Sequence, residues 1–523
     1  MTLSALLVLT LCAAGGLAAS TGDAKYTLPK DFLLGGGISS YQTEGAWDAE
    51  GKGVNVFDFG YHSTGSTPNG DVASDTYGHY AEDIDIAAEI GFNVFRFSIS
   101  WARIFPNGTN ATINQPGVDH YHKVLDKLIE KKIEPIVTLF HFDHPQALET
   151  EFGGWLGDEM PDVFAAYADF AFKTYGEKVK YWLTVNEASW YCLALGSGML
   201  YPKTYNTTAR QNKCLTNAIV AHAKAHAIYH DKYQSVQKGM VGFGAGPQFA
   251  RAANASSPED LAGAEKSNKV SGIALTVDAL VFGDFPEEAK KARNISFTDE
   301  EKKLIKGRVD FLGINVYGGT SVNASAGGGA TLPPGEGGSS VPPGDGGSGG
   351  PPGDGNHPGG FGDDGSAWVL REMPKWIKAR YEVNGRKLPI FITENGVHGD
   401  GNGTSPLHDW DERAVYCSAY LRELAAGINE DETRVFGYTL WSFVDTFEFH
   451  GFSNWGLVHV DFDSASLNRT KKDSWTFFQR VMQTRVVPLV EKGSTPFQPS
   501  GSAAFQSSAV ISTLAILLLR WLQ

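Results

Sequence analysis

Two glutamates stand where a carboxyl group could do chemistry. Glu187 comes just after the apolar run Tyr181 to Val185, and Glu394 comes directly after the apolar run Ile390 to Thr393. An isolated carboxylate at the end of a buried strand costs free energy unless it has partners or a chemical role. Two carboxyl groups that face each other can act as a proton donor and as a nucleophile or base, which is what cleavage of a glycosidic bond requires.

Further polar and aromatic side chains stand within or just after other apolar runs of the chain. They are Gln42, Arg96, His141, Asn186, Asn315, Tyr317 and Trp441. One such side chain would be unremarkable because loops are polar. Together with Glu187 and Glu394, however, these side chains mark seven of eight apolar runs, so we expect a shared site. Neither a Ser-His-Asp order nor a metal-ligand spacing competes with the two glutamates.

Eight short runs rich in β-branched and aromatic residues predict the strands that position these side chains. The runs are Phe32 to Ser39, Phe92 to Ser98, Glu134 to Phe140, Tyr181 to Val185, Met240 to Phe243, Phe311 to Val316, Ile390 to Thr393 and Val435 to Trp441. Between them, apolar residues recur at the spacing of core-facing helices. These helical patterns cover Asp75 to Ile90, His120 to Lys131, Asp158 to Phe172, Asn217 to Tyr233 and Glu412 to Ala425.

Eight strands that alternate with helices predict an α/β fold, a single (β/α)₈ TIM barrel with elaborated loops. An open doubly wound sheet is the alternative, but no Gly-x-Gly-x-x-Gly follows a strand to mark a dinucleotide site. Because the reactive residues of such barrels lie at the C-terminal ends of the strands, we expect the polar side chains named above to converge there.

Composition excludes other classes of protein. The chain has 523 residues, 42% of them hydrophobic, which is enough to bury a large core. Its formal net charge of -15 argues against a partner such as nucleic acid, because that class needs a basic face. Length alone would allow three domains of about 150 residues, but the repeating strand and helix pattern indicates one barrel over residues 21–492.

Both ends of the chain carry segments that are typical of protein targeting. Residues 1–20 are apolar, lack charged side chains and end in small residues, which predicts a secretory signal peptide. Residues 493–523 form a linker and an apolar tail, Ala509 to Leu519, which is too short to span a bilayer. We expect the tail to be a glycosylphosphatidylinositol (GPI) anchor signal at the cell surface, and a soluble secreted protein is the alternative.

Two further patterns favour secretion. Eight Asn-x-Ser/Thr sequences predict N-glycosylation at Asn107, Asn110, Asn206, Asn254, Asn294, Asn323, Asn402 and Asn468. Of the four cysteines, Cys12 would leave with the signal peptide, Cys192 and Cys214 are close enough in sequence to form a disulfide, and Cys417 is expected to be a buried thiol.

A tract over residues 327–365 interrupts the pattern between the sixth and seventh predicted strands. It contains 17 Gly and 7 Pro in 39 residues, so it cannot bury a core and is predicted to be a disordered loop. The Gly-every-third register of collagen fails at Ser339 to Val341. The loop would lie on the side of the barrel where active-site loops lie.

Seven motifs of the chain resemble those of the family 1 glycoside hydrolases, the β-glucosidase and myrosinase family. They are Gly-Gly-Gly-Ile-Ser-Ser-Tyr-Gln-Thr-Glu-Gly (35–45), Phe-Arg-Phe-Ser-Ile-Ser-Trp-Ala-Arg-Ile (95–104), Leu-Phe-His-Phe-Asp-His-Pro-Gln (139–146), Thr-Val-Asn-Glu (184–187), Gly-Ile-Asn-Val-Tyr (313–317), Ile-Thr-Glu-Asn-Gly (392–396) and Trp-Ser-Phe-Val-Asp-Thr-Phe-Glu-Phe (441–449). The resemblance spans about Lys30 to Gln483. It implies retaining hydrolysis of small-molecule β-glycosides or oligosaccharides without a metal or cofactor.

The resemblance also implies roles for individual residues. Glu394 would be the nucleophile, and Glu187 would be the acid that protonates the leaving oxygen and later deprotonates water. Arg96 and Asn315 would support catalysis, and Arg96 and Tyr317 would favour the charged form of Glu394. The remaining substrate-binding positions are Gln42, His141, Asn186, Tyr317, Trp441, Glu448 and Phe449.

Several positions depart from the pattern of the family. Family members usually carry Trp where this chain has Phe142 and Phe449, so two indole donors to sugar hydroxyls are absent and the sugar preference stays open. Ala188 replaces the Pro that usually follows the acid, while Phe452 and Asn454 replace a common Tyr and Arg. Both glutamates are retained.

Three functions therefore stay open at this point. The first is a retaining β-glycosidase, and the second is a thioglucosidase or transglycosidase, because the same pair of glutamates supports either. Glu187, which thioglucoside-cleaving plant relatives often lack, favours O-glycosides. The third is a non-catalytic carbohydrate-binding or co-receptor protein, which the presence of Glu187 and Glu394 disfavours. The aglycone and the oligomeric state are left open by the sequence.

Overall fold

The structure is a computed structural model that describes residues 24–324, 364–383, 385–399, 403, 405–449 and 451–499. Three predictions concern residues outside these ranges: the signal peptide, the GPI-anchor signal and all but the last two residues of the Gly/Pro tract. Asn402 also lies outside them. Within the described ranges, none of the helices is long and apolar enough to cross a membrane.

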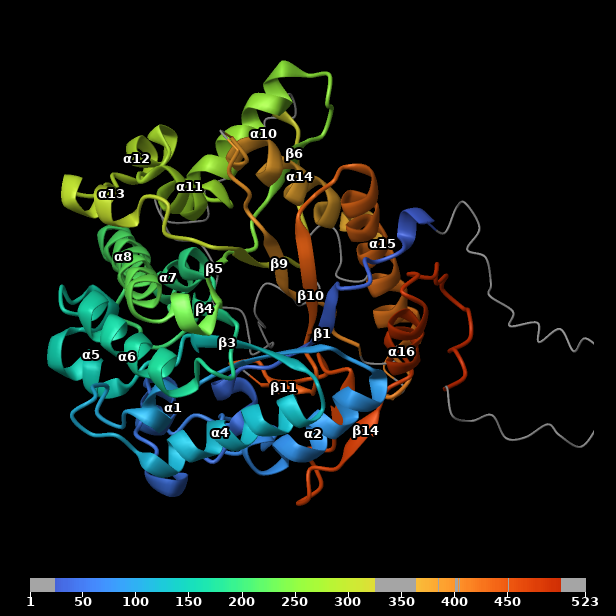
Figure 1. Cartoon of the computed structure of the whole chain (residues 1–523), viewed down its shortest axis with the longest axis horizontal. Helices are drawn as coiled ribbons and strands as arrows, with labels where there is room; N and C mark the ends of the chain where they lie inside the picture. The colour runs from blue at the N-terminus through green and yellow to red at the C-terminus, as the bar shows by residue number, and fades with distance from the viewer. Residues whose placement is uncertain are drawn as a thin grey trace, which may run out of the picture.

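Eight parallel strands close into a barrel at the centre of the molecule (Figure 1). The strands are β1 (Leu33–Gly37), β2 (Val94–Ser98), β3 (Glu134–Phe140), β4 (Tyr181–Val185), β5 (Met240–Ala245), β7 (Leu312–Asn315), β9 (Ile390–Asn395) and β10 (Val435–Trp441). Their order around the barrel follows the chain, and β10 pairs with β1 to close it. The predicted (β/α)₈ barrel and all eight predicted strands are confirmed.

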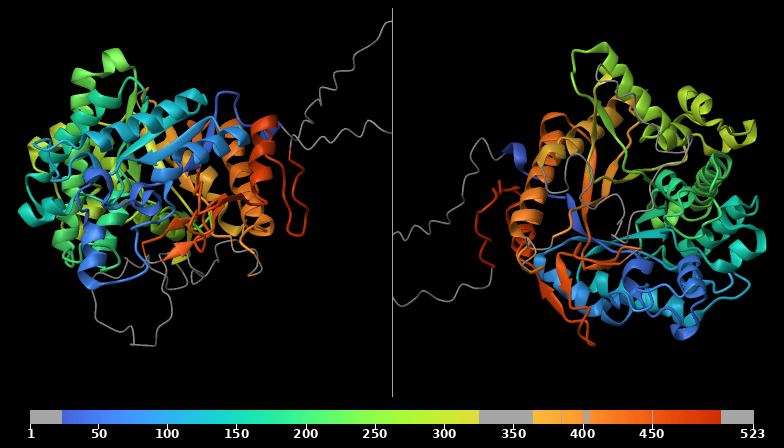
Figure 2. Two further views of the ribbon diagram at one scale, coloured as in Figure 1. Left: turned by 90° about the horizontal axis from the view of Figure 1, so that it is seen from below. Right: turned by 180° about the vertical axis from the view of Figure 1, so that it is seen from behind.

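Helices surround the barrel, as the views in Figures 1 and 2 show. They are α1 (Val56–Thr64), α2 (Thr76–Ile90), α3 (Trp101–Ile104), α4 (Gln115–Glu130), α5 (Gln146–Phe152), α6 (Met160–Tyr175), α7 (Ala188–Gly196), α8 (Thr208–Lys232), α9 (Gln234–Gln237), α10 (Pro258–Val270), α11 (Ala274–Phe282), α12 (Glu287–Arg293), α13 (Asp299–Ile305), α14 (Val369–Tyr381), α15 (Val415–Glu430) and α16 (Trp475–Thr484).

Two helices begin earlier than their periodicity predicts. Helix α8 begins at Thr208 because the side chain of Thr207 accepts a hydrogen bond from the Arg210 amide and caps the helix. Helix α4 begins at Gln115, with a proline in its first turn. In both cases the first turns are polar, so the apolar periodicity starts only after the helix does.

In the part of the chain that the structure describes, three pairs of short strands lie in the loops around the barrel. The pair β6 (Ala250–Ala252) and β8 (Thr320–Val322) is parallel, whereas β11 (Thr446–Phe447) with β12 (Phe452–Ser453) and β13 (Val458–Val460) with β14 (Arg469–Lys471) are antiparallel. These strands account for the elaborated loops that the length of the chain predicts.

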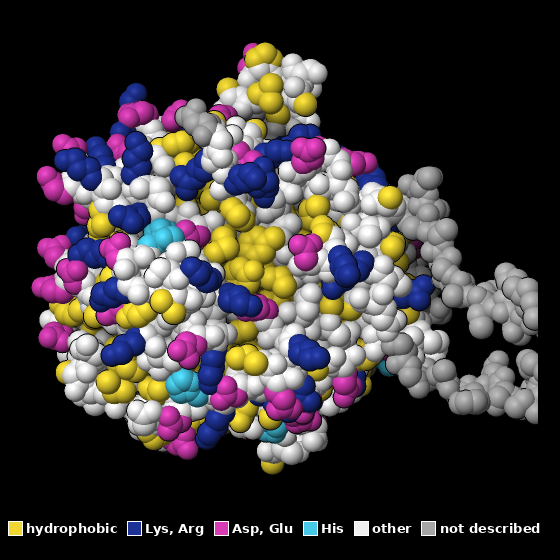
Figure 3. All heavy atoms as spheres, in the orientation of Figure 1, with side chains coloured by type: hydrophobic (Ala, Val, Ile, Leu, Met, Phe, Trp, Pro, Cys, Tyr) yellow, Lys and Arg dark blue, Asp and Glu magenta, His cyan; other side chains and the backbone are white. Residues whose placement is uncertain are grey.

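A cluster of apolar side chains lies beneath the C-terminal ends of the barrel strands. It consists of Val94, Ile136, Leu183, Phe311 and Phe391, all of which are buried. Val94 and Phe391 precede Arg96 and Glu394 on their strands by two and three residues. The polar side chains near the strand ends therefore stand above an apolar layer. On the face shown in Figure 3, hydrophobic side chains gather near the centre, and basic and acidic side chains are intermingled around them.

A disulfide joins Cys192 on α7 to Cys214 on α8, and Cys417 is a buried free thiol. Both cysteine predictions are confirmed. The bond closes a loop with a sequence separation of 22 residues. Closing such a loop in the unfolded chain is worth roughly 3 kcal/mol, so replacing both cysteines by alanine should lower the free energy of unfolding by about that amount in denaturant titrations. A reductant should destabilise the parent protein and not the double variant; equal effects on both would contradict the prediction.

Candidate active site

The C-terminal ends of the strands bring the predicted site residues together. Trp441 at the end of β10 and Arg96 on β2 both pair with Gly37 at the end of β1. Asn315 and Glu394 are neighbours across β7 and β9. Most of the predicted catalytic and substrate-binding side chains are buried, whereas Tyr317 and Glu448 are only partly buried. The buried ones are Gln42, Arg96, His141, Asn186, Glu187, Asn315, Glu394, Trp441 and Phe449.

The carboxylate of Glu394 has a donor on each of its oxygens. The Arg96 guanidinium forms an ion pair and a hydrogen bond with Oε1, and the Tyr317 hydroxyl donates a hydrogen bond of 2.7 Å to Oε2. Arg96 also donates to the Thr393 carbonyl at 3.2 Å, which fixes the guanidinium to the strand that carries Glu394. A carboxylate with a donor on each oxygen is held in one orientation.

A network of amides and hydroxyls orients the rest of the Arg96 side chain. Its Nη2 donates to Asn186 Oδ1 at 2.7 Å and its Nε to Thr138 Oγ1 at 3.2 Å. Asn315 Nδ2 donates to the same Asn186 oxygen at 3.1 Å, while Asn315 Oδ1 accepts from Thr393 at 2.7 Å. Side chains of β2, β3, β7 and β9 and of the residue after β4 are thereby locked around one centre.

Glu187 is in a different electrostatic environment from Glu394. Burial of its carboxyl group, and next the negative charge of Glu394, raise the pKa of Glu187 to about 8. A hydrogen bond with Asn315 and the charge of Arg96 act in the opposite direction but are weaker. At neutral pH Glu187 is therefore mostly protonated, which is what a general acid needs.

The backbone at Glu187 turns sharply to present this side chain. Glu187 has φ 41° and ψ 48°, in the left-handed region, and is the residue before helix α7. Non-glycine residues in this region cost about 1–3 kcal/mol and cluster at functional sites. Just after β9, a Cβ added at Gly396 would lie 1.9 Å from the Trp441 carbonyl oxygen, so only glycine lets the chain approach the end of β10 this closely.

Glu448 is the centre of a second polar group. Its Oε2 accepts from Gln42 at 2.8 Å, and its Oε1 accepts from Thr446 at 2.6 Å and from the Trp441 indole at 3.2 Å. Burial raises the pKa of Glu448 to about 7, against the effect of these hydrogen bonds. Several donors and acceptors in one buried place are what recognition of sugar hydroxyl groups needs.

His141 connects the two polar groups. Its ring stacks on Trp441 with centroids 5.7 Å apart, and its Nε2 lies 3.4 Å from Asn186 Nδ2. Burial and the charge of Arg96 hold the pKa of His141 well below its usual value, so the ring is neutral. Its buried Nδ1 has no hydrogen-bond partner among the described residues, which leaves this atom available to a ligand.

Phe142 and Phe449 lie in an aromatic cluster beside these groups. Their ring centroids are 5.9 Å apart, Phe142 stacks on Tyr191 at 5.1 Å, and Phe449 lies 4.9 Å from Phe57. Both side chains offer only apolar surface where an indole would offer a donor. Trp455, whose ring lies 5.6 Å from Tyr317, is a further aromatic neighbour of the site that the sequence patterns did not single out.

Removing the Tyr317 hydroxyl tests whether its hydrogen bond to Glu394 contributes to catalysis. We expect Tyr317→Phe to lower kcat/KM by about 10- to 100-fold, because a hydrogen bond to a charged group is worth about 1.5–3 kcal/mol. Initial rates on an aryl β-glycoside measure this. Unfolding curves should stay close to those of the parent protein, and an unchanged kcat/KM would contradict the role of this hydroxyl.

The fold and the paired carboxyl groups define a barrel enzyme of the glycosidase class, and comparison with known proteins gives the family. The model of Glycosyl hydrolase family 1 matches residues 24–486. The chain therefore belongs to glycosyl hydrolase family 1, whose members are enzymes that hydrolyse glycosides and act on small carbohydrate substrates.

Several curated relatives are similar over most of this chain. Myrosinase 1 of Brevicoryne brassicae is 32% identical over 478 residues, which are 88% of this chain and 99% of the relative. Cyanidin 3-O-glucoside 7-O-glucosyltransferase (acyl-glucose) of Delphinium grandiflorum is 35% identical over 87% of this chain and 90% of its own. The chain spans only 24% of human lactase/phlorizin hydrolase, at 32% identity.

Solved structures of family members superpose on the barrel. Aphid myrosinase has a TM-score of 0.74 and 31% identity, covering 88% of this chain and 100% of its own. A mutant of a rice beta-glucosidase in a covalent complex with Glc also has a TM-score of 0.74 and 31% identity, covering 86% of this chain and 98% of its own. A covalent sugar complex in a relative is what a retaining mechanism produces in this family.

Proposed function

We propose that this chain is a retaining β-glycosidase that hydrolyses terminal β-D-glycosides, with Glu394 as nucleophile and Glu187 as acid and base. One observation carries the proposal: Glu187, a carboxyl group with a raised pKa, interacts electrostatically with Glu394, whose two oxygens accept hydrogen bonds from Arg96 and Tyr317. The covalent complex of the rice relative supports the double displacement.

In the first step, a carboxylate oxygen of Glu394 attacks the anomeric carbon. The bond from that carbon to the aglycone oxygen breaks, and the proton of Glu187 moves to this oxygen, so that the alcohol leaves uncharged. Arg96 and Tyr317 position the attacking carboxylate through the hydrogen bonds described above. The product of this step is a glycosyl ester on Glu394.

In the second step, Glu187 acts as a base. Ester formation removes the negative charge of Glu394, which is one of the two causes that raise the pKa of Glu187, so Glu187 ionises more readily. It accepts a proton from water while the water oxygen attacks the anomeric carbon and the ester bond to Glu394 breaks. Two inversions return the sugar with its original configuration.

The second polar group is suited to hold the sugar. Gln42, His141 and Glu448 would bind hydroxyl groups, Asn186 would bind the 2-hydroxyl, and Trp441 would offer its ring to the C–H face of the sugar. Phe142 and Phe449 offer no donors, so they would bind apolar edges only. The lack of these two donors affects whether the site prefers glucose, galactose or fucose.

The pH dependence of kcat/KM should follow the protonation of Glu187. Because the free enzyme needs this proton for the first step, the protonated fraction falls as the pH rises through about 8, the pKa of Glu187. Above that pH we expect kcat/KM to fall by about tenfold per pH unit. A pH profile on an aryl β-glycoside measures the descending limb, and a flat profile up to pH 10 would contradict the assignment.

The choice of substrate can be tested with a panel of glycosides. We expect turnover of aryl β-D-glucoside, β-D-galactoside or β-D-fucoside, and release of the β-anomer as the first sugar product in proton NMR spectra. Absence of turnover on every β-glycoside, with an intact fold, would contradict the proposal. Release of the α-anomer would contradict the double displacement.

Two of the relatives suggest another substrate or another reaction for the same site. Similarity to the aphid myrosinase makes a thioglucoside a second candidate substrate, and similarity to the Delphinium glucosyltransferase makes transfer to an alcohol a second candidate reaction. Adding a glucosinolate and, separately, an acceptor alcohol to the panel distinguishes both from hydrolysis of an O-glycoside.

We also propose that the protein is secreted and glycosylated, with a GPI anchor at the cell surface. The disulfide and the exposure of all seven described sequon asparagines support secretion and glycosylation, while the apolar tail Ala509 to Leu519 is the reason to propose the anchor. These asparagines are Asn107, Asn110, Asn206, Asn254, Asn294, Asn323 and Asn468. An endoglycosidase should lower the mass of the protein from its native source, and a phosphatidylinositol-specific phospholipase should release it from membranes; failure of either would refute that part.

A further inference from the structure

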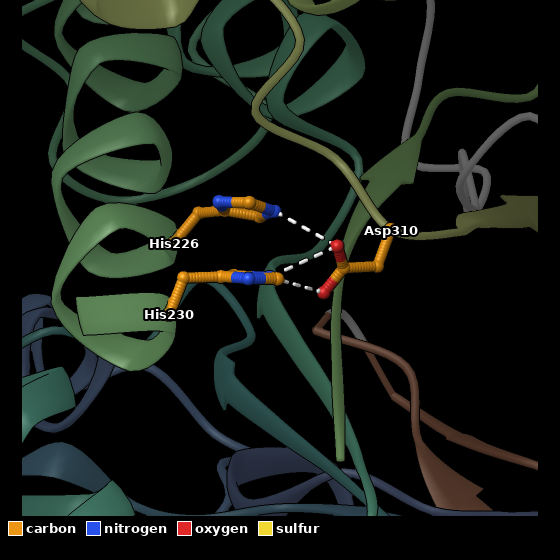
Figure 4. Close-up of side chains that lie close together, drawn as sticks. All are labelled: His226, His230 and Asp310. Atoms are coloured by element: carbon orange, nitrogen blue, oxygen red, sulfur yellow. Dashed lines mark hydrogen bonds and ion pairs between the residues drawn. The ribbon is translucent and has the colours of Figure 1, made fainter. Parts of the chain in front are cut away.

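Two histidines of helix α8 and one aspartate meet away from the catalytic glutamates. His226 and His230 are four residues apart on the helix, so their rings project from the same face, and the rings stack with centroids 4.2 Å apart (Figure 4). Asp310, which precedes β7, points its carboxylate at both rings. The ligand atoms of the three side chains all lie within 4.8 Å of one another.

The distances in this cluster are close to those of a metal coordination sphere. His226 Nε2 lies 3.1 Å from Asp310 Oδ1, and His230 Nε2 lies 2.9 Å from Asp310 Oδ2. In a tetrahedral zinc site with bonds of about 2.0–2.2 Å, neighbouring ligand atoms are about 3.3 Å apart. Small side-chain movements would therefore place a cation within bonding distance of all three groups.

The residues around the cluster fix the position of the Asp310 carboxylate and leave one side of the cluster exposed to solvent. The backbone amide of Val241, at the start of β5, donates to Asp310 Oδ2 at 2.8 Å, the kind of outer contact that fixes metal ligands. His226 is nearly buried, whereas the side chains of His230 and Asp310 are 32% and 19% exposed. An ion can thus enter, and water can complete its coordination.

A third histidine on the same helix face is already occupied by other contacts. His222 Nδ1 lies 2.7 Å from Thr184 Oγ1 and its Nε2 lies 2.5 Å from the Arg308 carbonyl oxygen. His222 is therefore excluded as a ligand, and the donor set consists of two imidazoles and one carboxylate. Zinc and neighbouring divalent transition metals prefer such nitrogen and oxygen sets, whereas calcium and magnesium prefer oxygen alone.

We propose that His226, His230 and Asp310 form a binding site for a divalent transition metal of the zinc type. The site would join helix α8 to the N-terminal ends of β5 and β7, at the opposite end of the strands from Glu187 and Glu394. Its role is structural, since a metal that binds the folded chain stabilises it by mass action. The site is independent of the glycosidase mechanism.

The test uses the full chain without a histidine tag, stripped with a chelator and titrated with Zn²⁺ by calorimetry. We expect one Zn²⁺ per chain and a rise of a few degrees in melting temperature. Loss of an outer contact typically weakens metal binding by about 10- to 100-fold. Asp310→Asn and His230→Ala each remove a ligand, so each should weaken Zn²⁺ binding by more than that. His408→Ala is the matched control, because His408 forms an exposed pair with Asp473 at 3.0 Å outside the cluster.

The binding results with the parent protein and the variants distinguish a metal site from its absence. Stoichiometric binding that both cluster variants lose and His408→Ala keeps supports the site. Absence of stoichiometric binding to the parent protein, or equal binding by the variants, overturns it. If Asp310→Asn fails to fold, the partly exposed His230→Ala carries the test alone. Visible absorption of the Co²⁺-loaded protein, lost in His230→Ala, provides a second readout that does not depend on stability.

Discussion

Replacing Glu394 by glutamine should abolish turnover of β-glycosides. We expect Glu394→Gln to lower kcat by at least about 10⁴-fold, because loss of a covalent nucleophile removes the whole two-step pathway. The amide has nearly the shape of the carboxyl group but cannot form a glycosyl ester. Arg96 and Tyr317, which donate to the carboxylate, would then face a neutral acceptor. Rates on an activated aryl β-glycoside measure the effect.

Two controls make this prediction specific. Glu151→Gln makes the same chemical change at an exposed position of helix α5, and its activity should equal that of the parent protein. In Glu394→Ala, azide should restore turnover and yield the α-glycosyl azide, because it attacks from the space that the carboxylate leaves. Activity of Glu394→Gln within tenfold of the parent would show that another group is the nucleophile.

Replacing Glu187 by glutamine should have an effect that depends on the leaving group. For an alkyl β-glycoside, whose alcohol needs a proton to leave, we expect kcat/KM to fall by about 10²–10⁴-fold. For a dinitrophenyl β-glycoside, whose phenol leaves without a proton, the first step should be nearly unchanged. The descending limb of the pH profile near pH 8 should disappear in the variant, because it reports the proton of Glu187.

Azide tests the second role of Glu187. It needs no base to attack the glycosyl ester, so it should accelerate turnover of the dinitrophenyl substrate by Glu187→Gln and yield the β-glycosyl azide. An equal loss of activity on both substrates, with the pH limb retained, would assign the acid to another residue. Glu448, whose pKa burial raises to about 7, would then be the next candidate.

The barrel could be predicted because each strand is a short apolar run between helical patterns. Strands buried on both faces read as nearly continuous β-branched and aromatic runs, as in β3 and β10, and their bounds agree with the prediction. The start of α8 could not be predicted, because its first turn, Thr-Ala-Arg-Gln, shows no apolar periodicity and depends on the Thr207 cap.

The sequence predicts which side chains should gather at the strand ends, but it does not predict the contacts among them. The motifs identify Glu187 and Glu394, yet Arg96 reaches Glu394 across 298 positions of the chain, and only barrel closure makes that contact visible. Trp455 does not follow any predicted strand, so its position beside Tyr317 is seen only in the structure. Asp310 likewise lies 80 positions from His230, so the spacing of the histidines alone could not reveal the cluster.

The most direct measurement is mass spectrometry of the protein after reaction with an activated 2-deoxy-2-fluoro-β-glycoside. The fluorine slows both steps by destabilising positive charge at the anomeric carbon, and the good leaving group keeps the first step fast enough for the ester to accumulate. We expect one fluoroglycosyl group per chain, on the peptide that contains Glu394. No adduct from any glycoside that the enzyme turns over, or an adduct on another residue, would contradict it.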